Sequence, residues 1–347
     1  KPFVLAAAIK QGMSLNTTIE APQEPNMSGE RLRVCAANGD TICTTDRGYS
    51  PKNSTGSGRF NLKTGTERSV NTFYIQLLQE TGICEPATIA QESGIFKQVP
   101  DDPEGQPLDQ VASFTLGSNT VSPLAMAEGY AMFAARGVHC KSIAVLEVRD
   151  RTGKPIATRK PECNRVLDKN VADGVNFVLQ GVIDNPGATG NRMRLDGGRP
   201  AAGKTGTTDN AVAVWFAGYT PQLAAAVAVA DLDGKQTTLD GREYNGERIS
   251  PACGGCIPGP IWAVAMNGAL EGVPEASFTR PNPSVVRGVN ENVPDVRGME
   301  FDAAADRLGD FGFGAHLAGE VVSAIARGLV VDTDPAPGDE VDAGSSV

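Results

Sequence analysis

The sequence predicts an α+β fold, in which an antiparallel sheet flanked by helices is followed by a second, small α+β module. The apolar run 211–219 is separated from residues 223–230 only by a tight turn, which predicts an antiparallel pair of strands. Residues 142–149 and 155–160 resemble another hairpin around the polar residues 151–154. Hairpin strands with flanking helical segments are typical of the α+β class.

Helical segments are expected on both sides of these strands. Residues 1–12 have the composition of a helix body that ends at a glycine. Ser122 suits an N-cap and Pro123 the first turn of a helix that Gly137 closes. The other expected helices cover residues 72–80, 168–183 and 261–270. Residues 13–61 are rich in Pro, Gly, Asn and Ser, which predicts a surface excursion with short strands.

The chain is expected to divide into a large domain, 1–279, a linker, 280–291, and a small domain, 292–347. The linker is predicted from its clustered Pro, Asn and Gly residues. Within the small domain the expected elements are a strand over 293–299, a helix over 300–311, and short strands over 328–331 and 345–347.

The net charge of −10 is unevenly distributed. Residues 292–347 hold eleven acidic residues and three Arg, so 3 − 11 = −8 falls in the small domain. The sequence has no basic patch, which argues against binding to nucleic acid, and the acidic stretch is most simply a solvated surface. No apolar run approaches a membrane span, and no signal peptide is seen. Because the sequence starts in mid-helix, we expect it to be part of a longer chain.

Seven cysteines are many for a cytosolic enzyme, and they favour three disulfides in an oxidising, extracytoplasmic location. Three placements are suggestive: Cys35 and Cys43 bracket a polar loop, Cys140 and Cys163 flank the expected hairpin, and Cys253 and Cys256 could close a small loop. Cys84 is then left over. The alternatives for the last pair are zinc binding, although no second ligand pair is near, and a redox role. The sequence leaves the pairing open.

Residues 203–210, with the sequence Gly-Lys-Thr-Gly-Thr-Thr-Asp-Asn, precede the apolar run 211–219. Glycines let a ligand approach the backbone, Lys204 supplies a positive charge, and the threonines supply hydroxyls for hydrogen bonds. These features predict a site where a substrate lies along a strand edge. The alternative is a polar turn, since short motifs often occur by chance.

Second copies of two short motifs in this sequence show that neither motif is specific by itself. A second Lys-Thr-Gly-Thr stands at 63–66, but it leads into a helical segment, so only the copy at 204–207 fits a strand edge. Ser69-Val70-Asn71 opens an expected helix, yet Ser-x-Asn also occurs at 14–16. The alternative for Ser69 is an ordinary N-cap, and Lys1 could stand by chance before its Ala-rich helix.

Taken together and in order, these motifs resemble the C-terminal transpeptidase part of a class A, bifunctional penicillin-binding protein of the actinobacterial type, with one PASTA domain. Lys1-Pro2-Phe3 matches the family's Ser-x-x-Lys motif from its lysine onward, Ser69-Val70-Asn71 matches the second motif, and 197–209 match the third. Residues 49–53 resemble the stretch before the second motif. Residues 293–299 and 334–338 are similar to PASTA signatures.

The resemblance implies a penicillin-binding-protein or serine β-lactamase-like fold and an acyl transfer through a serine ester. The nucleophilic serine would lie three residues before Lys1, outside this sequence, so whether it is deleted, modified or merely not included stays open. That serine would attack the D-Ala-D-Ala carbonyl of a peptidoglycan stem peptide, and a neighbouring amine would then form the cross-link. β-Lactam antibiotics would mimic the substrate and remain as acyl esters.

The resemblance also implies a role for each site residue. Lys1 would accept the serine proton, Ser69 would relay a proton to the leaving group, Asn71 would hold Lys1 and the substrate, and Lys204 would supply positive charge. The substrate-binding residues would be Thr205, Gly206, Thr207 and Thr208, with the Thr207 N–H in the oxyanion hole. No metal or cofactor is implied.

Three alternatives remain at this point. A D,D-carboxypeptidase or a β-lactamase would share the motifs but pass the acyl group to water. A non-catalytic wall-binding or sensor protein would fit the nucleophile missing from the sequence. The small domain could bind muropeptides, or it could serve as a spacer.

Overall fold

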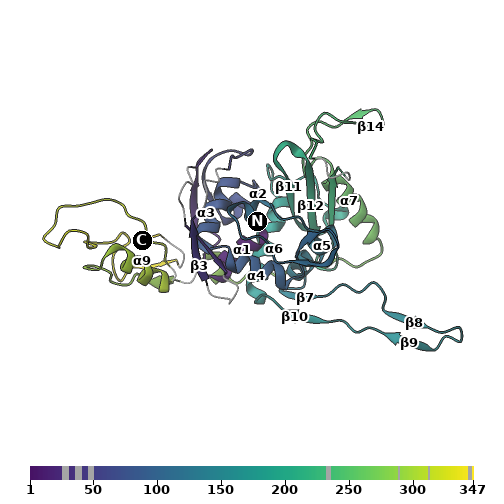
Figure 1. The fold of residues 1–347 in the computed structure, drawn as a ribbon, viewed down its shortest axis with the longest axis horizontal. Helices are drawn as coiled ribbons and strands as arrows, with labels where there is room; N and C mark the ends of the chain where they lie inside the picture. The colour runs from purple at the N-terminus through teal and green to yellow at the C-terminus, as the bar shows by residue number, and fades with distance from the viewer. Residues whose placement is uncertain are drawn as a thin grey trace.

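The computed structural model describes residues 1–25, 31–35, 41–45, 51–231, 236–287, 290–311, 313–342 and 346–347. Helices and strands mix as the sequence predicts, with most strands in antiparallel pairs (Figure 1). Tyr49 and Ser50, part of the stretch expected before the second motif, lie outside the described residues. No helix in the described ranges is long and apolar enough to cross a membrane.

The central sheet has three antiparallel strands in the order β11 (Ala202–Thr207), β12 (Ala213–Tyr219) and β13 (Ala224–Ala230). The predicted antiparallel pair is therefore confirmed. Successive residues of β12 face opposite sides, as alternation in a strand requires. Phe216 packs beside Trp262 of α7 (Pro258–Ala269), whereas Ala217 and Tyr219 belong to the larger core on the other face.

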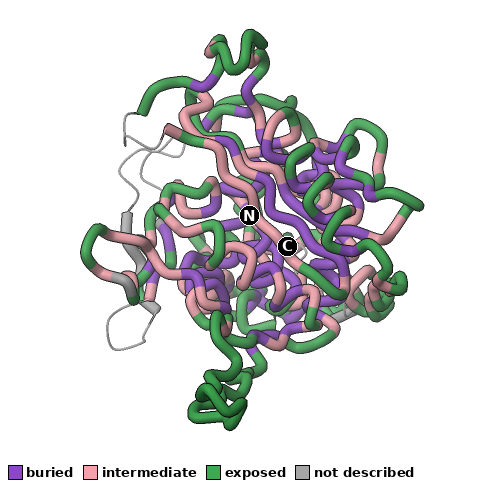
Figure 2. Tube along the Cα trace, turned by 90° about the vertical axis from the view of Figure 1, so that its right-hand side faces the viewer, coloured by how far each residue is buried: buried purple, intermediate pink, exposed green. Residues whose placement is uncertain are grey.

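The larger core surrounds α1 (Pro2–Lys10), a helix whose residues 2–9 are all buried. A helix that is apolar on every side must be covered by other elements. Here α3 (Asn71–Thr81), α4 (Cys84–Glu92) and α6 (Lys169–Asp184) cover it. Figure 2 shows buried segments through the middle of the domain and exposed ones at its periphery. The predicted helices over 1–12, 72–80 and 168–183 are confirmed.

The expected helix after Ser122 is α5 (Pro123–Ala134), and its caps follow the sequence signals. Ser122 Oγ accepts the N–H of Ala125 at 3.1 Å. Gly137 has φ +87°, and a Cβ there would lie 2.2 Å from the Leu167 carbonyl oxygen, so only glycine fits this turn. Helix α5 packs on β12 and β13.

The predicted hairpin forms a long arm that projects from the domain (Figure 1). At its base β7 (Val138–Cys140) pairs with β10 (Cys163–Arg165), and near its tip β8 (Glu147–Arg149) pairs with β9 (Pro155–Thr158). The disulfide Cys140–Cys163 closes the base, as the hairpin suggested.

The suggested pairing of Cys35 with Cys43, which would leave Cys84 without a partner, is wrong. Cys35 pairs with Cys84, because the Ile83 N–H donates to the Arg33 carbonyl at 2.7 Å and brings the start of α4 beside β2 (Arg31–Cys35). Cys253 and Cys256 are bonded to each other, so their sulfurs are not zinc thiolates as the alternative required. Three disulfides are present, as the sequence favoured.

The surface excursion over 13–61 has short strands as expected: β1 (Thr18–Ala21) pairs with β4 (Gly58–Asn61), and β2 pairs with β3 (Thr41–Thr45). The remaining elements are short: α2 (Leu62–Glu67), β5 (Lys97–Val99), β6 (Asp102–Gln106), η1 (Ala112–Leu116), η2 (Asp196–Gly198), η3 (Asp209–Ala211), β14 (Glu243–Tyr244) and β15 (Glu247–Arg248).

The small domain has its own core of Val293, Val296, Ala304, Leu308 and Phe313. Its helix α9 (Phe301–Asp310) confirms the prediction over 300–311. The strand predicted over 293–299 is wrong: β16 (Asn290–Asn292) pairs with β17 (Glu340–Asp342) and ends before Pro294, which has no N–H for a ladder. The strand expected over 328–331 is reduced to a single bridge at Leu329. Of the strand expected over 345–347, Ser345 lies outside the described residues and Ser346 forms a single bridge.

The predicted linker is partly helical, since α8 (Pro283–Arg287) lies within it. Its carbonyl groups accept hydrogen bonds from the large domain: Val285 O from the Leu15 N–H at 3.2 Å, and Val286 O from Ser14 Oγ at 2.9 Å. Residues with the composition of a linker are thus hydrogen-bonded to the segment that follows α1 in the large domain. The domain boundaries themselves stay a prediction.

A buried amide in α6 ties the sheet to α5. Asn176 Nδ2 donates to the Phe133 carbonyl at 3.0 Å, and Tyr219 Oη donates to Asn176 Oδ1 at 2.6 Å. All three residues are buried. A buried polar group that loses its partner costs about 1–3 kcal/mol.

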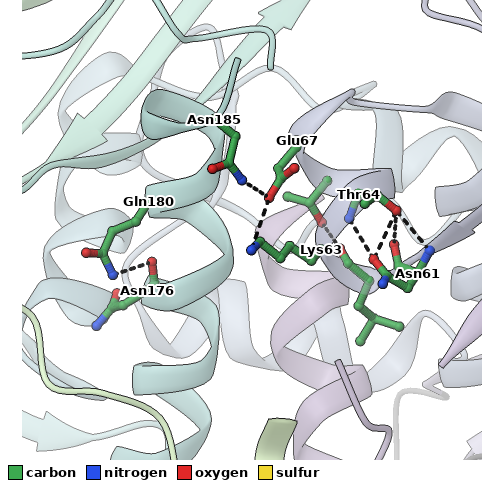
Figure 3. A network of polar contacts seen from close by, with 9 residues as sticks. Asn61, Lys63, Thr64, Glu67, Asn176, Gln180 and Asn185 are labelled. Atoms are coloured by element: carbon green, nitrogen blue, oxygen red, sulfur yellow. Dashed lines mark hydrogen bonds and ion pairs between the residues drawn. The ribbon is translucent and has the colours of Figure 1, made fainter. Parts of the chain in front are cut away.

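We therefore expect Asn176→Ala to lower the free energy of unfolding by about 1–3 kcal/mol, since it leaves the buried Tyr219 hydroxyl without its partner, while the Phe133 carbonyl keeps the N–H of Arg136 at 3.0 Å. Urea denaturation followed by near-UV circular dichroism measures this. Gln180→Ala is the matched control, because Gln180 lies one turn further along α6 and its side-chain amide donates to the Asn176 carbonyl (Figure 3). Equal losses from both variants would contradict the assignment.

Candidate active site

Three segments of the large domain that are far apart in the sequence bring their polar side chains together in one cluster. Lys1 Nζ donates to Ser69 Oγ at 3.1 Å and to Asn71 Oδ1 at 2.7 Å. Lys204 Nζ donates to the same Ser69 Oγ at 2.7 Å. The Ser69 hydroxyl therefore lies between the Nζ atoms of two lysines, and the four residues predicted as catalytic form one cluster.

The backbone fixes each member of this cluster. Lys1 directly precedes the buried helix α1, and Asn71 is the first residue of α3. Ser69 has φ +56°, a left-handed conformation uncommon outside glycine and asparagine. The N-cap alternative for Ser69 is wrong, because Val70 occupies the N-cap of α3 and the Ser69 hydroxyl meets the two lysines instead.

The oxygen atoms around the two lysines are neutral. Besides Ser69 Oγ, Lys1 Nζ contacts the Ser69 carbonyl at 2.8 Å, and Lys204 Nζ contacts the Thr205 carbonyl at 3.0 Å. Burial lowers the pKa of Lys204 to about 7. Burial, together with the charge of Lys204, lowers the pKa of Lys1 well below its ordinary value. An amine with a lowered pKa can accept a proton near neutral pH.

The second Lys-Thr-Gly copy has a structural role. It lies in α2, where Asn61 and Thr64 form a capping box and Lys63 Nζ lies 4.0 Å from Glu67 Oε1 (Figure 3). Gly65 allows the close approach of Phe73, since a Cβ there would be 2.6 Å from the ring. The distinction between the two copies drawn from their sequence context is confirmed.

The threonines of β11 differ in their partners. Thr205 Oγ1 donates to Thr189 Oγ1 at 2.8 Å. Thr207 is exposed at the end of the strand, and its hydroxyl accepts the N–H of Gly254 at 3.1 Å. Thr208 Oγ1 exchanges hydrogen bonds with the backbone of Ala213, which fixes the turn into β12.

Among the described residues, no further strand pairs with the edge of β11 opposite β12, because β11 is the first strand of the three-stranded sheet. Gly203 and Gly206 both pack against β12: a Cβ would lie 2.9 Å from the Phe216 ring and 3.2 Å from Trp215 Cβ, respectively. An extended ligand can pair with such an edge through main-chain hydrogen bonds.

Comparison with known proteins identifies the family. Residues 1–248 match the penicillin binding protein transpeptidase domain, and residues 291–347 match the PASTA domain. This chain belongs to the penicillin-binding protein transpeptidase family. Among relatives, penicillin-binding protein 1A of Mycolicibacterium smegmatis is 30% identical over 299 residues, which cover 81% of this chain and 34% of that protein.

Solved structures agree with the fold of the transpeptidase family. The penicillin-binding protein PonA1 from Mycobacterium tuberculosis superposes with a TM-score of 0.64 at 26% identity, covering 85% of this chain and 73% of that chain. Its complex with penicillin V gives a TM-score of 0.61 at 25% identity, covering 81% and 70%. The chain spans about a third of the length of the curated relatives it matches.

Three contributors to this transpeptidase-family site were missed by sequence reasoning. The Lys52 carbonyl accepts Asn71 Nδ2 at 2.9 Å, Thr189 holds Thr205, and Gly254 holds Thr207. Lys52 stands in the stretch expected before the second motif, which was a usable signal. Thr189 and Gly254 act through contacts between distant segments, and no local pattern marks them.

The lowered pKa of Lys204 predicts how stability changes with pH. Between about pH 7 and the ordinary lysine value near 10.4, the unfolded chain holds the Lys204 proton while the folded chain has lost it. The free energy of unfolding therefore rises with pH in this window, by up to about 1.4 kcal/mol per pH unit. Below pH 7 both states are protonated and this contribution is constant.

We expect Lys204→Met to be more stable than the parent at pH 7 and to lose this part of the pH dependence, because the variant has no buried ammonium. Thermal and urea unfolding between pH 6.5 and 10 measure both effects. Lys63→Met, in the structural copy of the motif, is the matched control and should keep the parent's slope, because it leaves the buried Lys204 in place. A parallel slope for Lys204→Met would disprove the burial argument.

Proposed function

We propose that this chain is the transpeptidase part of a serine-type D-Ala-D-Ala transpeptidase that cross-links peptidoglycan stem peptides and is acylated by β-lactams. The observation that carries the proposal is the Ser69 hydroxyl shared between Lys1 and Lys204, with Asn71 on Lys1. Such a chain of exchangeable protons suits an acyl transfer, which needs a base first and an acid afterwards.

The reaction would begin at a serine three residues before Lys1 in the longer polypeptide. Its hydroxyl oxygen attacks the D-Ala-D-Ala carbonyl while Lys1 Nζ takes the hydroxyl proton. Ser69 passes a proton to the nitrogen of the departing D-Ala, and Lys204 Nζ is placed to replenish it at 2.7 Å. The serine ester is then attacked by an amine of a second stem peptide, which forms the cross-link and frees the serine.

The free edge of β11 is the proposed place for the acyl donor. The peptide would lie along the edge of β11, with its terminal carboxylate near the hydroxyls of Thr205 and Thr207. The N–H of Thr207 would donate to the oxyanion, together with the N–H of the nucleophilic serine. Gly206 keeps the strand free of side-chain bulk between these threonines, and Thr208 shapes the turn.

The location proposed is the extracytoplasmic face of the cell membrane. Three disulfides support it, since disulfides persist in oxidising compartments. For the PASTA domain, muropeptide binding and a spacer role both stay predictions. Muropeptide-dependent chemical-shift changes at residues 292–347 in the whole chain would favour binding, and their absence would favour a spacer.

The experiment that tests the proposal is mass analysis of the longer polypeptide after exposure to penicillin. We expect a single adduct, mapped to the serine three residues before Lys1. Ser69→Ala should slow acylation by about 10²–10⁴-fold, because proton transfer loses its relay. Lys63→Ala, in the structural copy of the motif, should acylate like the parent.

Acylation followed by product analysis separates the alternatives. A cross-linked dimer from stem peptides supports the transpeptidase, whereas release of free acid alone supports a D,D-carboxypeptidase or β-lactamase. If the folded protein with its serine present forms no adduct, the non-catalytic wall-binding or sensor function replaces this proposal.

A further inference from the structure

The disulfide-closed loop Cys253–Cys256 lies directly against the strand that carries the Lys-Thr-Gly-Thr motif. A Cβ on Gly254 would be 2.4 Å from the Trp215 carbonyl oxygen and 2.6 Å from that of Gly206. A Cβ on Gly255 would be 2.6 Å from the Thr189 carbonyl oxygen. These distances exclude any side chain, so Gly254 lets the loop backbone contact the sheet and Gly255 lets it contact Thr189.

The loop is held in place at both ends. The disulfide joins its first and last residues across a Cα–Cα distance of 4.9 Å, and the N–H groups of Cys256 and Ile257 donate to the Cys253 carbonyl. The chain then enters α7, whose Trp262 is buried against β12 and donates its ring N–H to the Gly218 carbonyl at 3.1 Å. The loop therefore has little freedom to shift along β11.

The loop makes one hydrogen bond to a residue of the candidate active site. The buried Gly254 N–H donates to Thr207 Oγ1 at 3.1 Å. A threonine hydroxyl has a single proton, and once its oxygen accepts from Gly254, that proton is free to donate elsewhere. Thr207 is exposed at the end of β11, so its donor proton is available to a ligand. Thr205, by contrast, uses its proton on Thr189.

We propose that the Cys253–Cys256 loop is a positioning element that sets the Thr207 hydroxyl as a donor to the carboxylate of the acyl donor. The inference rests on the proposed function, and it assigns the loop no contact with the substrate. Gly254 acts through Thr207 alone, and the disulfide keeps the Gly254 N–H at hydrogen-bond distance.

The test opens the loop with the double variant Cys253→Ser/Cys256→Ser in the longer polypeptide and measures penicillin acylation at increasing concentration. We expect the apparent Kd for penicillin, which carries a carboxylate, to rise about three- to tenfold, the worth of one oriented hydrogen bond. The rate constant at saturation and its pH profile should stay near the parent's, because the lysines and Ser69 are untouched. Cys140→Ser/Cys163→Ser, which removes the arm's disulfide, is the matched control and should leave Kd unchanged.

A double-mutant cycle shows whether the loop acts through the hydroxyl. In a Thr207→Val background, opening the loop should have no further effect on Kd. If the parent acylates but the loop variant keeps its Kd, or weakens it equally in the Thr207→Val background, the inference is overturned. A parent that fails to acylate overturns the proposed function instead. Gly254→Ala keeps the disulfide but displaces the loop, so it should also raise the Kd for penicillin. If the double cysteine variant does not fold, an unchanged Kd in Gly254→Ala overturns the inference.

Discussion

The side-chain nitrogens of two lysines share one serine hydroxyl in a partly buried site, and the rest of the large domain is arranged to make this possible. Burying a charge without an opposite charge is costly, and a second like charge nearby raises the cost. The cost lowers the pKa of Lys1 and Lys204, and within the described residues the oxygens that their Nζ atoms contact are neutral. The site thus holds two amines whose pKa values are lowered by burial, at the expense of stability, as is common for functional sites.

The scaffold compensates by holding the three contributing segments rigidly. Helix α1 is apolar on every side and is surrounded by α3, α4 and α6. The segment before Ser69 is fixed by buried contacts, such as the Thr66 hydroxyl with Tyr74 Oη at 2.6 Å. Asn53 holds the start of α3 through the Thr72 N–H and hydroxyl. The left-handed backbone of Ser69 can persist because these neighbours determine it.

The two Lys-Thr-Gly copies are connected through Thr189. The Thr189 N–H donates to the Glu67 carbonyl in α2 at 3.0 Å, and its hydroxyl accepts from Thr205 in β11. Helix α2, which contains the structural copy, thereby positions Thr189. Thr189 in turn holds Thr205 of the Lys-Thr-Gly copy in the site. The Cys253–Cys256 loop supports the same strand from Gly254, so β11 is braced at Thr205 and at Thr207, while no strand in the described part of the chain pairs with its outer edge.

The sequence by itself determined the helices with strong apolar patterns and caps, the antiparallel pair β12–β13, and the motif residues Lys1, Ser69, Asn71 and Lys204. These features are local: an N-cap such as Ser122, a glycine such as Gly137, or a short motif in context specifies them. The tertiary structure alone decided which cysteine meets Cys35, that the strand in the small domain ends before Pro294, and that Ser69 faces two lysines. Thr189, Gly254 and the attachment of α8 also depend on segments that are distant in the sequence, because such contacts are set by the packing of whole elements and leave no pattern along the chain.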